Sequence, residues 1–182
     1  MLLCRDGSGD FTTIQAAIDA ASDGDTIKIR PGTYKESLDL SAKGLTIRKS
    51  PLESTDSVTI RSNDSAVVLL QANTGGISNS SITLRGLNFN GQERNMCIVL
   101  NGFLVTIDRC TIQNGRDIVF SGAGGIDLTE AEEVNLVDST IQACCGKQGA
   151  VYMLGDISVS PEVTIRGCTF EDNGTAGTTS SP

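Results

Sequence analysis

The stretch VTIRGCTFEDN (163–173) is one of four copies of a single short phrase in this chain. The other copies are ITLRGLNFNG, VTIDRCTIQN and VNLVDSTIQA, which begin at Ile82, Val105 and Val134. Because the copies start at positions 82, 105, 134 and 163, they follow one another at intervals of 23, 29 and 29 residues. Intervals of this size are typical of proteins built from stacked structural repeats. The repetition therefore decides the architecture.

Each copy predicts two short strands joined by a corner. Val163 and Ile165 alternate with Thr164 and Arg166, which is the pattern of a strand with one buried face. A two-residue corner leads to a second strand at 168–170, whose outer two residues are expected to be buried. The expected third strands of the coils occupy 97–100, 125–128 and 150–153. Turns rich in Asn and Gly, and no helices, separate the strands, so we predict an all-β parallel β-helix with three sheets and about six rungs.

Equivalent positions of the phrase should stack on one another from coil to coil. One predicted inward column holds Leu87, Cys110, Ser139 and Cys168, and another holds Phe89, Ile112, Ile141 and Phe170. Earlier strands are expected at 25–29, 45–47, 58–60 and 67–70, with first-sheet strands beginning near Ile27, Leu45, Ile82, Val105, Val134 and Val163. Asn90, Asn114 and Asn173 follow the second strand, and we expect left-handed turn geometry there.

The two ends of the chain are expected to differ. Residues 11–22 show a helical apolar period, with Thr12 or Thr13 able to cap the start, so we predict a helix that covers the first rung. PGTY (31–34) indicates a turn. We assign the β-helix domain to 1–172 and a flexible tail to 173–182, where small residues predominate and no side chain could cap the last rung. We expect further coils of a longer chain to follow.

The composition excludes several classes of function. The net charge of −8 opposes binding to nucleic acid, and no apolar run is long enough for membrane insertion. The chain has no histidine, so triads of Ser-His-Asp or Cys-His type are excluded. The six cysteines include no pair of CxxC motifs, which argues against a thiolate zinc site.

The cysteines divide into two groups. Cys110 and Cys168 share an inward column two rungs apart, a separation of about 9.6 Å that exceeds the reach of a disulfide, so we expect buried thiols. Cys144 and Cys145 lie in a predicted turn and are better candidates for external pairing, with Cys97 or with no partner.

The opening DGSGDFTTIQAAIDAASDGDTIKIRPGTYKESLDL (6–40) resembles that of pectinesterases and related proteins of the right-handed parallel β-helix (pectin lyase-like) superfamily. The resemblance covers about the first quarter of the chain and implies the fold. Pectinesterase catalysis depends on later Gln-Ala-rich, Gln-Asp-Thr and Asp-Phe-Ile-Phe-Gly segments, and none is found after Ser50, so we carry over no catalytic residue. GGID (124–127), QGAVY (148–152) and the stretch from Phe170 to Asn173 resemble repeats of polymorphic outer-membrane proteins, which favours an adhesive or structural protein.

A polar stripe on the outer face of the first sheet is the candidate ligand site. Its candidate residues are Arg48, Arg85, Thr106, Asp108, Asn135 and Arg166. Arg85 and Asp108 should be neighbours across one rung, and such a stripe suits an acidic glycan. Ordinary cross-strand pairing on a solvated surface explains the same residues, and we weight this interpretation above a binding site.

The leading hypothesis is a non-catalytic, secreted or cell-surface domain that binds carbohydrate or mediates adhesion. A polysaccharide lyase or pectinesterase-like enzyme acting on acidic plant-type glycans is the first alternative, and a rigid spacer is the second. We expect no cofactor; the alternative of Ca²⁺ would draw on acidic turns. The acidic residues concerned are Asp117, Asp127, Asp138 and Asp156.

Overall fold

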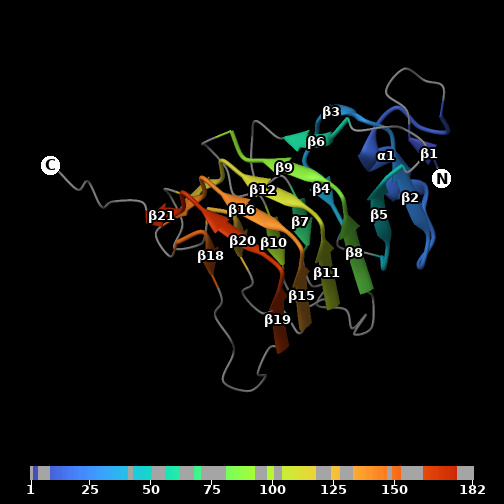
Figure 1. Ribbon diagram of the computed structural model, residues 1–182. Coiled ribbons are helices and arrows are strands. Elements are labelled where there is room, and N and C mark those ends of the chain that lie inside the picture. The colour runs from blue at the N-terminus through green and yellow to red at the C-terminus, as the bar shows by residue number, and fades with distance from the viewer. Residues whose placement is uncertain are drawn as a thin grey trace, which may run out of the picture.

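The chain forms a column of parallel strands that coil around an apolar interior (Figure 1). The computed structural model describes residues 2–3, 9–40, 43–50, 56–61, 68–70, 81–92, 98–100, 104–117, 124–127, 133–146, 149–152 and 162–175. Successive coils lie side by side from the N-terminal to the C-terminal end of the column (Figure 1). The predicted parallel β-helix is therefore confirmed.

The first sheet contains seven described strands in the order β1-β2-β5-β8-β11-β15-β19. These are β1 (Leu2–Leu3), β2 (Thr26–Ile29), β5 (Thr46–Lys49), β8 (Ser81–Arg85), β11 (Leu104–Asp108), β15 (Glu133–Val137) and β19 (Glu162–Arg166). Six of them match the predicted first-sheet strands. Strand β1 was not predicted; it pairs with β2 so that Leu2 lies beside Lys28. A strand of two residues shows no alternation by which it could be found.

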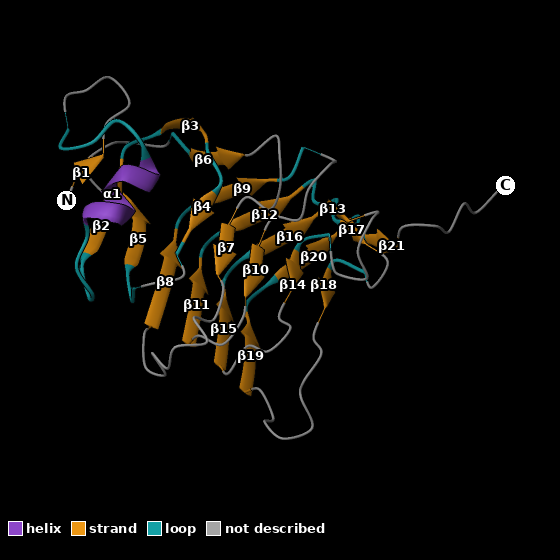
Figure 2. Ribbon diagram, turned by 180° about the vertical axis from the view of Figure 1, so that it is seen from behind, coloured by secondary structure: helices purple, strands orange, loops and turns teal. Residues whose placement is uncertain are grey.

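The second and third sheets complete most of each coil. The second sheet contains β3 (Gly32–Lys35), β6 (Val58–Arg61), β9 (Asn88–Asn90), β12 (Thr111–Gln113), β16 (Thr140–Gln142) and β20 (Thr169–Glu171). The third sheet, seen from behind in Figure 2, contains β4 (Leu38–Asp39), β7 (Val68–Leu70), β10 (Ile98–Leu100), β14 (Ile126–Asp127) and β18 (Val151–Tyr152). The prediction of a turn over PGTY is wrong. Most of that segment belongs to β3, where Tyr34 is buried and its hydroxyl donates to the Arg30 carbonyl at 2.9 Å.

A fourth sheet of three short strands follows the second sheet and was not predicted. It contains β13 (Arg116–Asp117), β17 (Cys145–Gly146) and β21 (Gly174–Thr175). Each strand is a pair of residues rich in small or polar side chains, so hydropathy carries no signal for it. β21 lies within the segment expected to form the tail, and residues 176–182 lie outside the described residues.

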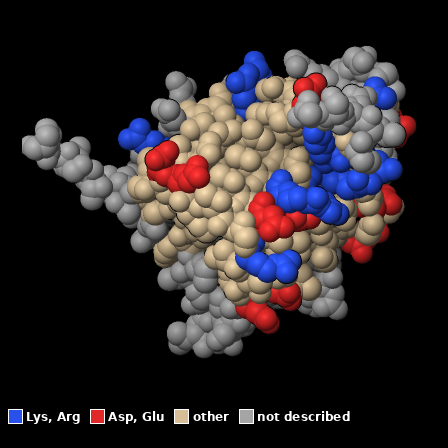
Figure 3. Space-filling view, viewed as in Figure 1, with Lys and Arg blue, Asp and Glu red and all other residues tan. Residues whose placement is uncertain are grey.

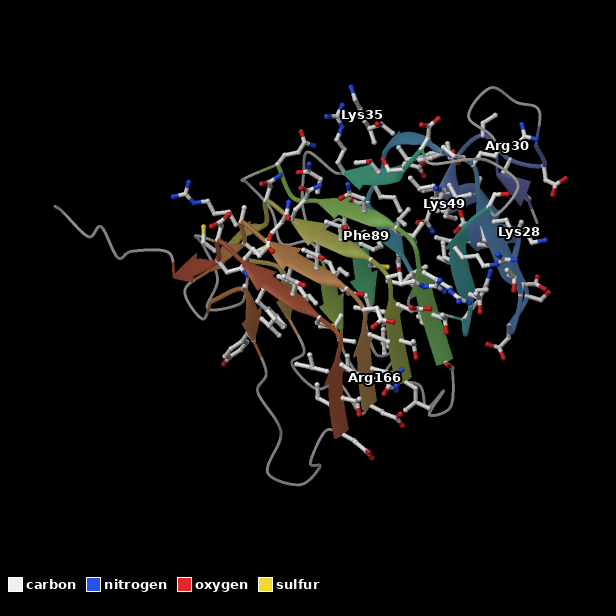
Figure 4. All side chains as sticks on the ribbon, viewed as in Figure 1. Lys28, Arg30, Lys35, Lys49, Phe89 and Arg166 are labelled. Atoms are coloured by element: carbon white, nitrogen blue, oxygen red, sulfur yellow. The ribbon has the colours of Figure 1, made fainter. Side chains whose placement is uncertain are left out.

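The coils stack in register, which confirms the predicted columns. Val105 pairs with Val134, and Val134 pairs with Val163. In the second sheet, Ile112 lies between Phe89 and Ile141. All these side chains are buried except Val163, which is partly exposed on the last coil. Figure 4 shows Phe89 on its second-sheet strand, within the stack of coils.

Corners in the coils that carry the repeated phrase use left-handed backbone geometry. Arg109 and Asp138 occupy this region at the corner between the first and second sheets, with φ of 52° and 47°. At the next corner Asn114 has φ of 55°, as predicted, but Asn90 and Asn173 do not have positive φ. Asn173 instead turns its side chain to the backbone, because its amide donates to the Ile141 carbonyl at 2.8 Å and its oxygen accepts from the Cys144 amide at 2.9 Å.

The N-terminal helix is fixed at both ends by side chains. α1 (Ile14–Ala20) begins after Thr13, whose hydroxyl accepts from the Ala16 amide at 3.3 Å. Both carboxylate oxygens of Glu36 accept backbone bonds at 3.0 Å, one from Ile14 and one from Gln15. At the other end, Lys43 donates to the carbonyls of Ile18 and Asp19. The predicted helix is thus confirmed within 11–22, and it packs against β2 and β4.

We predict that Glu36→Ala lowers the free energy of unfolding by about 1–3 kcal/mol, because two helix amides lose a charged acceptor. Chemical denaturation monitored by circular dichroism measures the change. Glu171→Ala removes the same carboxylate from an exposed strand and should change stability by less than about 0.5 kcal/mol. Equal losses in the two variants would contradict the capping role.

Candidate functional site

Two ladders of polar side chains run along the outer face of the first sheet. The first, called here the polar ladder, contains Thr26, Thr46, Thr83, Thr106, Asn135 and Thr164 in continuous register. The second begins with Lys28, Arg48 and Arg85, which we call the basic ladder. Since side chains two residues apart lie on the same face of a strand, the two ladders are adjacent.

The basic ladder places three like charges on neighbouring strands. Lys28 pairs with Arg48, and Arg48 pairs with Arg85. Strands of a sheet lie about 4.8 Å apart, so the three cations repel one another. Within the described residues, no ion pair or hydrogen bond involves the side chain of Lys28 or Arg48. The space-filling view shows Lys and Arg gathered on this N-terminal part of the molecule (Figure 3).

Asp108 continues the register beyond Arg85 and is held by two guanidinium groups. Arg85 Nε lies 2.8 Å from Asp108 Oδ2, which confirms that these residues are neighbours. Arg109 binds the same carboxylate with Nε at 3.1 Å and Nη2 at 3.2 Å. The side chains of Arg85 and Arg109 are 51% and 53% exposed, so these ion pairs are open to solvent. One carboxylate is therefore shared by two arginines, and positive charge remains in excess.

The predicted site residues do not all come together. Arg48, Arg85, Thr106 and Asp108 lie on the consecutive strands β5, β8 and β11. Asn135 donates to Glu133 Oε1 at 2.9 Å along its own strand. Arg166 lies on β19 (Figure 4). In the register of the sheet, Val137 stands between Arg166 and Asp108.

Two cationic residues of this face, Lys28 and Arg109, were not predicted. Lys28 lies in the expected strand 25–29, and extending the predicted stripe back by one coil from Arg48 would have found it. Arg109 lies at a corner, where the strand pattern gives no direction for a side chain. Its left-handed backbone places it beside Asp108.

Cys110 lies directly beneath this corner and is the buried thiol nearest the ladders. Its side chain is 2% exposed, and its Sγ donates to the carbonyls of Leu84 and Asp108, both at 3.5 Å. Burial raises the pKa of the Cys110 thiol from 9.0 to about 12. A thiol with this pKa remains protonated at neutral pH and is a poor nucleophile.

The other described cysteines are also free thiols, namely Cys144, Cys145 and Cys168. The suggestion that Cys144 pairs externally is wrong, because it is fully buried and donates to the Gln142 carbonyl at 3.3 Å. The Cys144 amide also donates to the side-chain oxygen of Asn173 at 2.9 Å. Cys97 lies outside the described residues.

The structure also bears on the calcium alternative. The described residues contain no group of three or more Asp, Glu, Cys or His that could hold a metal ion, and Asp156 lies outside them.

A cavity of about 160 Å³ opens at the corner before the fourth sheet. It is lined by Asn114, Gly115, Arg116, Ala143 and Cys145, and none of these belongs to the two ladders.

Comparison with known families supports the fold independently. The profile described as right handed beta helix region matches residues 41–181 of this chain. The chain belongs to this β-helix family. The match begins after the helical cap and includes every repeated phrase.

Solved structures resemble this β-helix chain over nearly its whole length. Two crystal structures of the pectin methylesterase from Aspergillus niger, one deglycosylated and one retaining an N-acetylglucosamine stub, match it with TM-scores of 0.55 and 0.54. Each alignment has 17% sequence identity and covers 99% of this chain and 68% of the esterase chain. At this identity the likeness shows the pectin lyase-like fold alone. No curated protein sequence matches the chain.

No helix among the described residues is long and apolar enough to cross a membrane.

We predict that Asp108→Asn changes the free energy of unfolding by less than about 1 kcal/mol, because ion pairs open to solvent contribute little. Urea denaturation of both proteins measures the difference. A larger loss would show that the Asp108 ion pairs serve mainly to hold the fold together.

A second prediction concerns Cys110 and pH. Since the thiol ionises near pH 9.0 when unfolded and near pH 12 when folded, its contribution to stability is complete below pH 9 and is lost as the pH rises toward 12. The stability of the wild type should therefore fall more steeply than that of Cys110→Ala between about pH 8 and about pH 11. Urea titrations at several pH values test this, and parallel curves for the two proteins would contradict it.

Proposed function

We propose that this β-helix binds an acidic polysaccharide on the outer face of its first sheet and does not catalyse its cleavage. The observation that carries the proposal is the basic ladder, in which Lys28, Arg48 and Arg85 lie in register on adjacent strands. Like charges in this arrangement cost free energy, and a bound polyanion would offset that cost. The ladder is present although the chain as a whole has a net charge of −8.

The neighbouring polar ladder suits the sugar part of such a ligand. Its threonine hydroxyls donate and accept hydrogen bonds, as sugar hydroxyls do. Thr46 and Thr83 are partly exposed beside Arg48 and Arg85, so both kinds of group are available on the same strands. An extended polymer lying across the strands would meet a cation and a hydroxyl on each coil.

The arrangement favours binding over chemistry. Asp108 is the one carboxylate in the register of the basic ladder, and its two oxygens are bound by Arg85 and Arg109. General acid and base catalysis on a glycan needs a carboxylate free to exchange protons with the substrate, and usually a second acidic group. An esterase or lyase activity is the alternative that the experiment must separate from binding.

The proposal implies a place where acidic polysaccharides are found, so we propose that the protein acts outside the cell or at its surface. Binding there would attach the column to a polysaccharide matrix. A rigid spacer without a ligand would not account for Lys28 and Arg48, whose charges no ion pair among the described residues neutralises.

We predict that the protein binds polygalacturonate at low salt, as measured by affinity electrophoresis and calorimetry, and that binding weakens as the salt concentration rises. Arg48→Ala and Arg85→Ala should each weaken binding roughly tenfold, the equivalent of one charge-assisted hydrogen bond. Asp108→Asn should strengthen it by removing the competing anion. Lys35→Ala is the matched control, because it removes an exposed cation from the second sheet and should leave affinity unchanged.

The same preparation should be incubated with methylated pectin and polygalacturonate while released acid and unsaturated product are monitored. Turnover that disappears in Asp108→Ala would overturn the non-catalytic assignment. Failure to bind polygalacturonate at low salt, or an equal effect of Lys35→Ala, would overturn the proposed binding site.

A further inference from the structure

The last described coil leaves an apolar end of the column exposed. Ile165 and Phe170 are 49% and 47% exposed, and they are the large exposed hydrophobic residues among the described part of the chain. Their equivalents one coil earlier, Leu136 and Ile141, are buried. The exposed pair lies on β19 and β20, at the end of the stack opposite α1 (Figure 1). Exposed apolar edges of sheets favour association.

The backbone of β19 determines which groups are free to pair. The Arg166 carbonyl accepts from the Asp138 amide at 2.9 Å, so Arg166 directs its backbone groups toward the preceding coil. In a parallel sheet these directions alternate along a strand. Val163 and Ile165 therefore direct their N–H and C=O groups away from the column, and no described strand lies on that side.

The order of side chains along β19 is complementary to itself. The strand reads Glu162, Val163, Thr164, Ile165, Arg166. If two copies run antiparallel with Thr164 opposite Thr164, then Val163 meets Ile165 and Glu162 meets Arg166. The outward-directed backbone groups belong to the Val163 and Ile165 positions, which are the positions that exchange both hydrogen bonds in this register. Side-chain pairing and backbone pairing thus require the same alignment.

We propose that a second copy of this chain binds to β19, antiparallel and related by a two-fold axis at Thr164. The contact is isologous, so each favourable pair occurs twice. Val163 and Ile165 extend the apolar interior from one column into the next, and the ion pairs of Glu162 with Arg166 lie on the outer face.

The neighbours of these charges within one chain support this choice of partner. Glu162 lies in register with Glu133, a residue of like charge, and Arg166 lies in register with Val137. Within the described residues, neither Glu162 nor Arg166 has an ion-pair partner of its own. Each would gain an oppositely charged neighbour from the second copy.

Charge exchange tests the alignment. Sedimentation velocity of the whole chain over a range of concentrations should show a dimer. Glu162→Arg and Arg166→Glu should each weaken the dimer by fivefold or more, since like charges then face each other twice, and the double variant should recover the wild-type association. Lys35→Glu is the control, because it changes an exposed charge far from β19 and should leave the dimer intact. A wild type that stays monomeric, or a double variant that stays weak, would overturn the proposal.

A cross-link tests the position of the axis. Residues opposite one another in a non-hydrogen-bonded pair have Cα atoms about 4.5 Å apart, which a disulfide can span. Thr164→Cys should therefore form a covalent dimer under mild oxidation, above the background of the parent protein. Thr106→Cys has the same orientation on a strand paired on both sides, and it should not cross-link. Absence of a Thr164→Cys cross-link, or equal cross-linking of both variants, would show that β19 does not pair in this way.

Discussion

The register between successive parallel coils is the constraint on which the rest of the structure depends. Each inner strand bonds its backbone groups alternately to the strand one coil earlier and to the strand one coil later, and the same register places an aliphatic side chain on its equivalent. A coil alone could not bury its apolar face, so its stability comes from its neighbours. The helix α1 closes one end of this repeating arrangement, and hydrogen bonds with Glu36 and Lys43 hold its two ends in place.

The same register acts on the side chains that point outward. It brings residues that are distant in the sequence, such as Lys28, Arg48 and Arg85, into one line on the sheet. In an irregular fold these like charges could lie apart and would not repel one another. The register also produces the ordered hydroxyls of the polar ladder. A charge placed on this face therefore acts as one member of a series, and this periodicity is what a repeating polymer can match. The strand β19 shows the complementary effect, because no described strand pairs with its outer side and the backbone groups there are available to a partner.

The repeated phrase was sufficient to predict the columns at Val105 and Ile112, because their alternation is strong and their spacing regular. It also brought Arg85 and Asp108 together correctly. Features that depend on few residues were not predictable. The strands β1 and β13 are two residues long, and the PGTY segment has the composition of a turn although Tyr34 is buried in β3. Arg109 escaped notice because its contact with Asp108 depends on a left-handed corner, which hydropathy does not encode.

The most direct test of this account is a methyl NOE experiment on protein with labelled valine and isoleucine methyl groups. Stacking in register places the side chains of Ile82, Val105, Val134 and Val163 about 4.8 Å from one coil to the next. The account predicts strong cross-peaks between consecutive members of this series and none between Ile82 and Val163. Absence of the cross-peak between Val105 and Val134, which are 29 residues apart in the chain, would contradict it.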